Sequence, residues 1–136
     1  MQDQSDVIRG MYEAFARGDV AGVMARLSAD LIWNEAENFI YADGNPYAGP
    51  QAVLAGIFAR LAAEWDGFSV VQDEIIGTGD RVVAWGRYRG VYKRTGVAVD
   101  AQFAHVWKLR NGEAVSFQEY TDTAQFRDAA AKSAAA

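Results

Sequence analysis

The stretch VDAQFAHVWKL, from Val99 to Leu109, decides the fold of this 136-residue chain. Its odd positions carry apolar residues and His105, whereas its even positions are more polar. Successive side chains of a β-strand point to opposite faces, so the pattern predicts a strand whose odd face is turned toward the core. His105, which is the only histidine of the chain, is therefore predicted to point inward.

Glu119 lies on the next predicted strand and shares the parity of the apolar residues Val115 and Phe117. A two-residue turn at Asn-Gly would pair position 105 with 118 and place Glu119 on the opposite face. A three-residue loop over 110–112, with its glycine left-handed, would pair 105 with 117 and leave Glu119 diagonal to His105, about 7–8 Å away. The apolar alternation fits only this second register, so we predict the three-residue loop. An inward imidazole and carboxylate are costly to bury unless they are paired or used.

The rest of the chain predicts helices first and strands afterwards. Apolar residues at helical spacing predict helices over about 8–15, 20–27 and 50–65. A short strand is predicted at Leu31–Glu35, and an irregular loop rich in turn residues at 36–49. Longer strands are predicted over about 68–76, 81–92, 97–109 and 114–121, followed by a short C-terminal helix from residue 122. This order predicts an α+β fold, in which a curved antiparallel sheet carries three helices from the N-terminal half on its concave face.

Composition limits the class of partner and cofactor. We expect a single domain over 1–136, with an ordered core at about 5–130 and a frayed alanine-rich tail at 131–136. The net charge of −5 without a basic cluster argues against nucleic acid and anionic membranes as partners. No stretch is long enough to span a membrane, and the polar N-terminus is unlike a secretory signal, so we expect a cytoplasmic protein. One histidine and no cysteine predict no transition-metal site, although they leave a carboxylate-bound metal open, and we expect no cofactor.

Several motifs resemble those of the nuclear transport factor 2-like superfamily, within it the SnoaL-like and ketosteroid-isomerase-like branch. They are YEAFARGD at Tyr12–Asp19, LIWNE at Leu31–Glu35, YAGP at Tyr47–Pro50, HVWKLRNG at His105–Gly112 and FQEYTD at Phe117–Asp122. The resemblance extends over about residues 5–130 and implies a cone-shaped, cystatin-like fold with an open mouth. It does not decide the activity, because the superfamily includes isomerases, cyclases, dehydratases, epoxide hydrolases and non-catalytic binders.

The resemblance also assigns roles to single residues. Polyketide cyclases of the SnoaL type have a histidine and an acid on their last two strands, and the separation of 14 residues between His105 and Glu119 matches theirs. In ketosteroid isomerases the proton-shuttling carboxylate follows the first strand, which is the place of Glu35. The oxyanion-stabilising positions of those enzymes correspond to Met11 and His105, and Tyr12 is offset from the first by about 100° around the helix. Steroid isomerisation by that mechanism is therefore not expected.

Epoxide hydrolases of the limonene type combine the acid on the last strand with an Arg and a second Asp on a central strand. Glu119 resembles the first of these groups, but Gly86 and Tyr88 lie where the other two belong. The resemblance to an epoxide hydrolase is therefore incomplete.

We predict an apolar pocket with acid/base groups and an interface on the opposite face of the sheet. The predicted catalytic residues are His105, Glu119 and Glu35. Contacts to a substrate are expected from Tyr12, Phe15, Trp33, Tyr47, Phe58, Tyr88, Phe103, Trp107 and Phe117. On the outer face, Trp85, Arg87 and Arg89 resemble the dimer interface that is common in this superfamily, so a homodimer is expected.

The resulting hypothesis is a cofactor-independent isomerase, cyclase or lyase that moves protons on a small, largely apolar carbonyl or hydroxyl compound. Glu119 or Glu35 would abstract a proton next to a carbonyl, and His105 would donate a hydrogen bond or a proton to the oxygen. Enclosure by aromatic rings should raise the pKa of the carboxylate. The alternatives are a non-catalytic ligand-binding module, in which His105 and Glu119 form a structural pair, and a protein-interaction domain.

Overall fold

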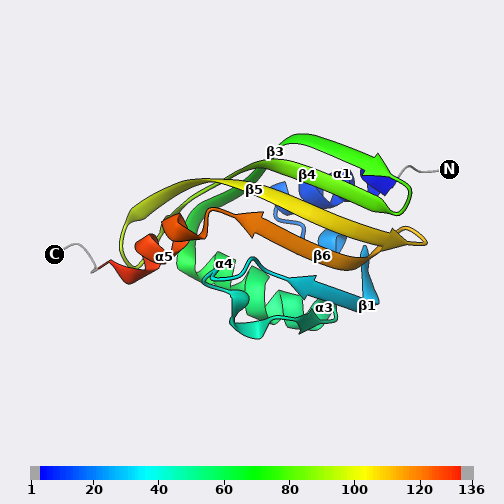
Figure 1. Cartoon of the computed structure of the whole chain (residues 1–136). Helices are drawn as coiled ribbons and strands as arrows, with labels where there is room; N and C mark the ends of the chain where they lie inside the picture. The colour runs from blue at the N-terminus through cyan, green and yellow to red at the C-terminus, as the bar shows by residue number, and fades with distance from the viewer. Residues whose placement is uncertain (1–3, 133–136) are drawn as a thin grey trace.

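The computed structural model describes residues 4–132 and has the predicted α+β order (Figure 1). Helices α1 (Gln4–Ala16) and α2 (Val20–Met24) precede strand β1 (Leu27–Asn34). One helical segment then comprises α3 (Pro50–Val53), the π-helical turn η2 (Leu54–Phe58) and α4 (Ala59–Glu64). The remaining elements are β3 (Trp65–Thr78), β4 (Arg81–Tyr92), β5 (Val97–Arg110), β6 (Glu113–Thr121) and α5 (Thr123–Ala131). Most of the tail predicted to fray, residues 133–136, lies outside the described residues.

The strands, with the short β2 (Tyr47–Ala48), form one curved six-stranded sheet in the order β2-β1-β6-β5-β4-β3 (Figure 1). Strands β3 to β6 are an antiparallel meander, as predicted, but β1 runs parallel to β6. The sheet is therefore mixed rather than wholly antiparallel. Strand β1 belongs to the N-terminal half, and the long chain between it and β6 permits the parallel arrangement.

The helices cover the sheet and enclose the core. Helix α1 packs against β3 and β4, α4 packs against β3, and α3 packs against β1, while α5 contacts β5 near one end of the sheet (Figure 1). Two predicted boundaries differ. The second helix ends at Met24 because Leu27 already belongs to β1, and Trp65 begins β3 with an extended backbone instead of ending the helix. None of the helices within residues 4–132 has the length and apolarity that a bilayer span requires.

The segment between β1 and α3, predicted as an irregular loop, contains two short elements. These are the 3₁₀ turn η1 (Ala42–Gly44) and strand β2 (Tyr47–Ala48), which pairs antiparallel with β1. The Asn45–Pro46 peptide bond is cis. The loop is held to the rest of the fold by Asn45, whose side-chain amide accepts from the Glu35 N–H at 2.9 Å and donates to the Glu35 carbonyl at 2.8 Å.

The register of β5 and β6 differs from the prediction. The turn has two residues, Asn111 and Gly112, both with positive φ, as a type I′ hairpin turn requires. The register then shifts at a β-bulge, where Val115 is inserted between the partners of Leu109 and Lys108. The extra residue restores inward parity, so His105 lies directly opposite Glu119 rather than diagonal to it. The inward face of Val99–Leu109 is confirmed, whereas the three-residue loop and the inward position of Val115 were wrong: Ala114 is the buried residue there.

Candidate functional site

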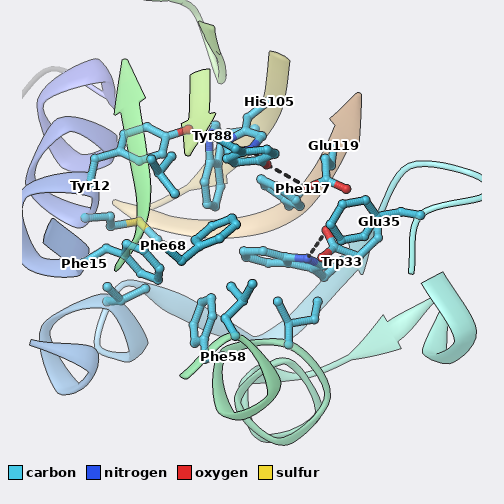
Figure 2. A pocket seen from close by; sticks show the side chains of 17 residues that line it. Tyr12, Phe15, Trp33, Glu35, Phe58, Phe68, Tyr88, His105, Phe117 and Glu119 are labelled. Carbon is cyan, nitrogen blue, oxygen red and sulfur yellow. Dashed lines mark hydrogen bonds between the residues drawn. The ribbon is translucent and has the colours of Figure 1, made fainter. Parts of the chain in front are cut away.

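An aromatic cavity lies between the sheet and the helices (Figure 2). Its empty space is about 590 Å³, including the part open to solvent. The polar groups in its wall are Tyr12, Glu35, Tyr88, His105 and Glu119. Its apolar wall consists of Met11, Phe15, Val23, Trp33, Phe39, Ile57, Phe58, Leu61, Phe68, Val70, Trp107 and Phe117. Such a cavity, mostly apolar with a few convergent polar groups, has the character of a small-molecule site.

Most of the residues predicted to contact a substrate line this cavity, but two do not. Tyr47 points away from it, and its hydroxyl donates to the Tyr41 carbonyl at 2.7 Å. Phe103 lies behind the wall, where its ring stacks on Tyr88 with centroids 4.6 Å apart. Both side chains pack in the interior of the protein. The alternation of apolar and polar residues predicts that a side chain is buried, but not whether it lines a pocket.

His105 is held by two tyrosine hydroxyls from different elements. The Tyr12 hydroxyl of α1 lies 2.6 Å from Nδ1, and the Tyr88 hydroxyl of β4 hydrogen-bonds to Nε2. Tyr12 in turn accepts a hydrogen bond of 3.0 Å from the Trp107 indole N–H. Tyr12 therefore reaches the site, although it is offset by about 100° around the helix from the position that the tyrosine has in ketosteroid isomerases. Met11, at that position, is also in the wall.

Glu35 and Glu119 meet at one end of the cavity because β1 and β6 are parallel and in register. Trp33 pairs with Phe117, their rings stack with centroids 3.8 Å apart, and each glutamate follows two residues later. The two carboxyl groups hydrogen-bond to each other. Each of the two residues is only 3% exposed. Sequence parity predicted each carboxylate separately, but it did not indicate that they touch.

Each carboxyl group has further donors. Glu119 accepts from the Tyr88 hydroxyl at 2.7 Å and from the Ala36 backbone N–H at 3.1 Å. Glu35 accepts from the Trp33 indole N–H at 3.2 Å (Figure 2). The sequence did not indicate the Ala36 contact, because the position of a backbone N–H depends on how the chain folds and not on the residue type. Phe68 also lines the cavity, although it was not among the predicted substrate contacts. It lies on β3, close to Trp65, where the strand begins and where the sequence predicted the end of a helix.

Burial shifts the protonation of all three predicted catalytic residues. It raises the pKa of Glu119 to about 7, against the effect of the hydrogen bonds that this group accepts. Burial, and next the charge of Glu119, raise the pKa of Glu35 well above its ordinary value. Burial lowers the pKa of His105 to about 3, so the imidazole is neutral at physiological pH. The two carboxyl groups therefore retain their protons to a higher pH than free glutamates do, and they titrate as a coupled pair.

The site contains no group of metal ligands. Within the described part of the chain, no three His, Cys, Asp or Glu side chains are arranged to hold a metal ion. The cavity presents a carboxyl pair, two tyrosine hydroxyl groups and a neutral imidazole.

Comparisons with known proteins agree with this architecture. A family model described as a SnoaL-like domain matches residues 8–117. An NTF2-like protein from Burkholderia thailandensis is 32% identical, with a TM-score of 0.92 over 97% of this chain and 100% of its own. An NTF2-like protein from Burkholderia pseudomallei is 30% identical, with a TM-score of 0.86 and the same coverage. TerC, crystallised with polyporic acid, shares the fold at 24% identity and a TM-score of 0.81, over 93% of this chain and 96% of its own. No curated protein matches the chain.

Proposed function

This chain belongs to the SnoaL-like family, and from that premise we propose that it is a cofactor-independent acid/base enzyme acting on a small apolar carbonyl or hydroxyl compound. The observation that carries the proposal is the buried pair formed by the carboxyl groups of Glu35 and Glu119 at the wall of an aromatic cavity. A carboxylate and a carboxylic acid in contact supply a base and an acid at the same place.

The proposed step is enolisation of a carbonyl compound. The ionised carboxylate takes a proton from the carbon next to the carbonyl, and the electron pair of the broken C–H bond forms the new C=C bond. The π electrons of the carbonyl move to its oxygen, which takes the proton of the neighbouring carboxylic acid. Where the enol is conjugated with a second C=C bond, the carboxylic acid formed in the first step gives its proton to the γ-carbon, and the enol O–H proton returns to the other carboxylate. The carbonyl re-forms, which completes an isomerisation and restores the carboxyl pair.

The contacts of His105 change its expected role. Both ring nitrogens already bond to tyrosine hydroxyls, and the residue is 5% exposed. A direct hydrogen bond from His105 to a substrate oxygen would break one of these contacts. We therefore assign proton transfer to the carboxyl pair and give His105 a supporting role.

The wall of the cavity defines the class of substrate. It presents rings of Trp33, Phe58 and Phe117 among others, and it contains no lysine or arginine. An anionic compound would meet the charge of the carboxyl pair without a cation to offset it. Burying an unpaired charge costs far more than the roughly 2–7 kcal/mol of an unpaired neutral polar group. A neutral ketone or alcohol with one or two rings fits the chemistry of the wall.

Exchange of substrate hydrogen for solvent deuterium tests the proposal without knowledge of the natural substrate. A neutral bicyclic ketone is incubated with the protein in deuterium oxide, and loss of the α-proton signal is followed by NMR. The wild-type protein should accelerate exchange, and Glu119→Gln should lower the rate by about 10²-fold or more. Glu37→Gln, which changes an exposed glutamate two residues from Glu35, is the matched control. Equal exchange rates for the wild type and Glu119→Gln would contradict the proposal.

One observation favours a non-catalytic binding module instead. Within residues 4–132, every buried side-chain nitrogen and oxygen already has a hydrogen-bond partner, which is what a purely structural network would show. Such a module would bind the ketone with saturation, in a fluorescence titration of the wall tryptophans, but would not accelerate its exchange.

A further inference from the structure

We infer that a directed chain of hydrogen bonds, beginning at the Trp107 indole, makes Glu119 the base and keeps the shared proton on Glu35. The inference deepens the proposed function and rests on it, because Glu119 acts as a base only if the protein is an enzyme. The location of the proton is nevertheless a property of the protein alone, so it can be tested whether or not the protein is an enzyme.

The direction of the chain follows first from Tyr88. This hydroxyl touches two acceptors, Glu119 and His105 Nε2, but has a single proton. It donates that proton to the Glu119 carboxylate at 2.7 Å. Its oxygen must then accept from Nε2, so His105 carries its proton on that nitrogen.

The same count applies at the other ring nitrogen. A neutral imidazole has one N–H, so Nδ1 is a bare acceptor when Nε2 is protonated. Tyr12 fills this acceptor with its own O–H at 2.6 Å. The Tyr12 oxygen accepts from the Trp107 indole, which has no other way to hydrogen-bond than as a donor. Each group in the chain therefore donates a hydrogen bond to the next one, and Tyr88, the last donor, donates to Glu119.

The two carboxyl groups receive unequal support. Glu119 accepts hydrogen bonds from Tyr88 and from the Ala36 N–H, whereas Glu35 accepts one, from Trp33. Hydrogen bonds to a charged acceptor are the strong ones, and two of them lower the pKa of a carboxylate more than one does. The negative charge is thus placed on Glu119, and Glu35 is the neutral partner that donates to it.

The surrounding charged and titratable groups agree with this assignment. Those that face the pair are Tyr12 from α1, Arg60 from α4, Tyr88 from β4 and His105 from β5. The hydroxyls and the imidazole are neutral. Arg60, whose charge acts weakly on Glu35, already pairs with Asp43 at 2.6 Å. His105 accordingly acts through Tyr88 and is a positioning residue rather than a catalytic one.

The single histidine permits a direct measurement of its tautomer. In ¹⁵N-labelled protein, two-bond correlations from the ring protons identify which nitrogen bears hydrogen. We expect one neutral species with the proton on Nε2 at pH 6 to 8. A proton on Nδ1, or an imidazolium in this range, would overturn the inference.

The proton of the carboxyl pair is located by titrating ¹³C-labelled glutamate side chains. Glu35→Gln leaves Glu119 to titrate, and Glu119→Gln leaves Glu35. The midpoint in Glu119→Gln should be the higher of the two, because Glu35 has fewer donors. The reverse order would overturn the assignment, even if the deuterium-exchange assay shows full activity.

Removal of one hydrogen bond from the chain should change the pKa of Glu119, which would stay unchanged if that bond were only structural. Tyr88→Phe should raise the midpoint of the Glu119 titration by about one to two pH units, the equivalent of one hydrogen bond to a charged group. Tyr120→Phe, an exposed tyrosine beside Glu119 on the outer face, is the matched control and should leave the midpoint unchanged. An unchanged midpoint in Tyr88→Phe would contradict the directed chain. If that variant does not fold, the comparison of the two Glu→Gln variants still decides.

Discussion

His105 and Glu119 lie directly opposite each other on β5 and β6, and the hydroxyl of Tyr88, from the neighbouring strand β4, bonds to both. The two side chains that sequence spacing brought together are thus linked through a third residue. Burial keeps His105 a neutral hydrogen-bonding group, and Tyr88 connects it to the carboxyl pair.

The buried carboxyl pair should make folding stability depend on pH. Burial raises the pKa of Glu119 from 4.5 to about 7, so the folded state binds this proton more tightly than the unfolded state. Its contribution is complete below pH 4.5 and is lost as the pH rises to 7, by about 3 kcal/mol. The difference in unfolding free energy between the wild type and Glu119→Gln should decrease over this range, as measured by urea denaturation. A difference that does not vary with pH would contradict the buried, proton-sharing pair.

His105 contributes with the opposite sign, which is why the variant must be compared with the wild type at each pH. Burial lowers the pKa of His105 to about 3, so the unfolded chain binds this proton more tightly than the folded one. Its contribution to stability is complete above pH 6.5 and is lost as the pH falls toward 3. Both proteins retain His105, so this contribution cancels in the difference.

Gly86 should not tolerate a side chain. A Cβ at this position would overlap the Val71 carbonyl oxygen, where β3 carries a bulge against β4. Backbone cannot move aside as a side chain can, so Gly86→Ala should cost about 2 kcal/mol or more in urea denaturation. Gly10→Ala is the control, since nothing lies near its Cβ on α1, and it should stabilise the protein by about 0.5–1 kcal/mol. Equal effects would show that the two strands are not this close.

Arg60 should hold the loop that supplies the Ala36 N–H. Its guanidinium binds both carboxylate oxygens of Asp43, and it lies over the Tyr41 ring at 4.4 Å. Arg60→Ala should speed hydrogen exchange at the Ala36 amide and cost about 1–2 kcal/mol, because packing and a bidentate ion pair are lost together. Arg17→Ala removes an exposed pair with Asp19 and should change stability by less than about 0.5 kcal/mol. Unchanged exchange at Ala36 in the first variant would exclude this role of Arg60.

The outer face of the sheet should form a homodimer. Trp85, Ala104 and Tyr120 lie in one row across β4, β5 and β6, and Tyr120 is 57% exposed. The predicted interface residues Arg87 and Arg89 flank this row, and both pair with Asp100. An exposed tyrosine and a half-buried tryptophan beside arginines are typical of an interface. Light scattering after size exclusion should give a dimer for the wild type and a monomer for Trp85→Glu. Ala62→Glu, on α4, should remain dimeric, and a monomeric wild type would contradict the prediction.

The sequence by itself determined which faces are buried and in what order the elements occur. Alternation of apolar and polar residues is a local property, so it identified the inward face of β5, the helix stripes and the aromatic character of the cavity. It also placed His105, Glu35 and Glu119 inside, because each shares the parity of its apolar neighbours.

Only the tertiary structure decided how these side chains meet. The bulge at Val115 adds one residue that no propensity marks, and it brings His105 opposite Glu119. The parallel pairing of β1 with β6 places Glu35 against Glu119, although 84 positions separate them in the chain. Helix α1, packed against β3 and β4, brings the Tyr12 hydroxyl to His105. Parity limits each residue to one of two faces, whereas contact between distant residues depends on register and packing that many parts of the chain determine together.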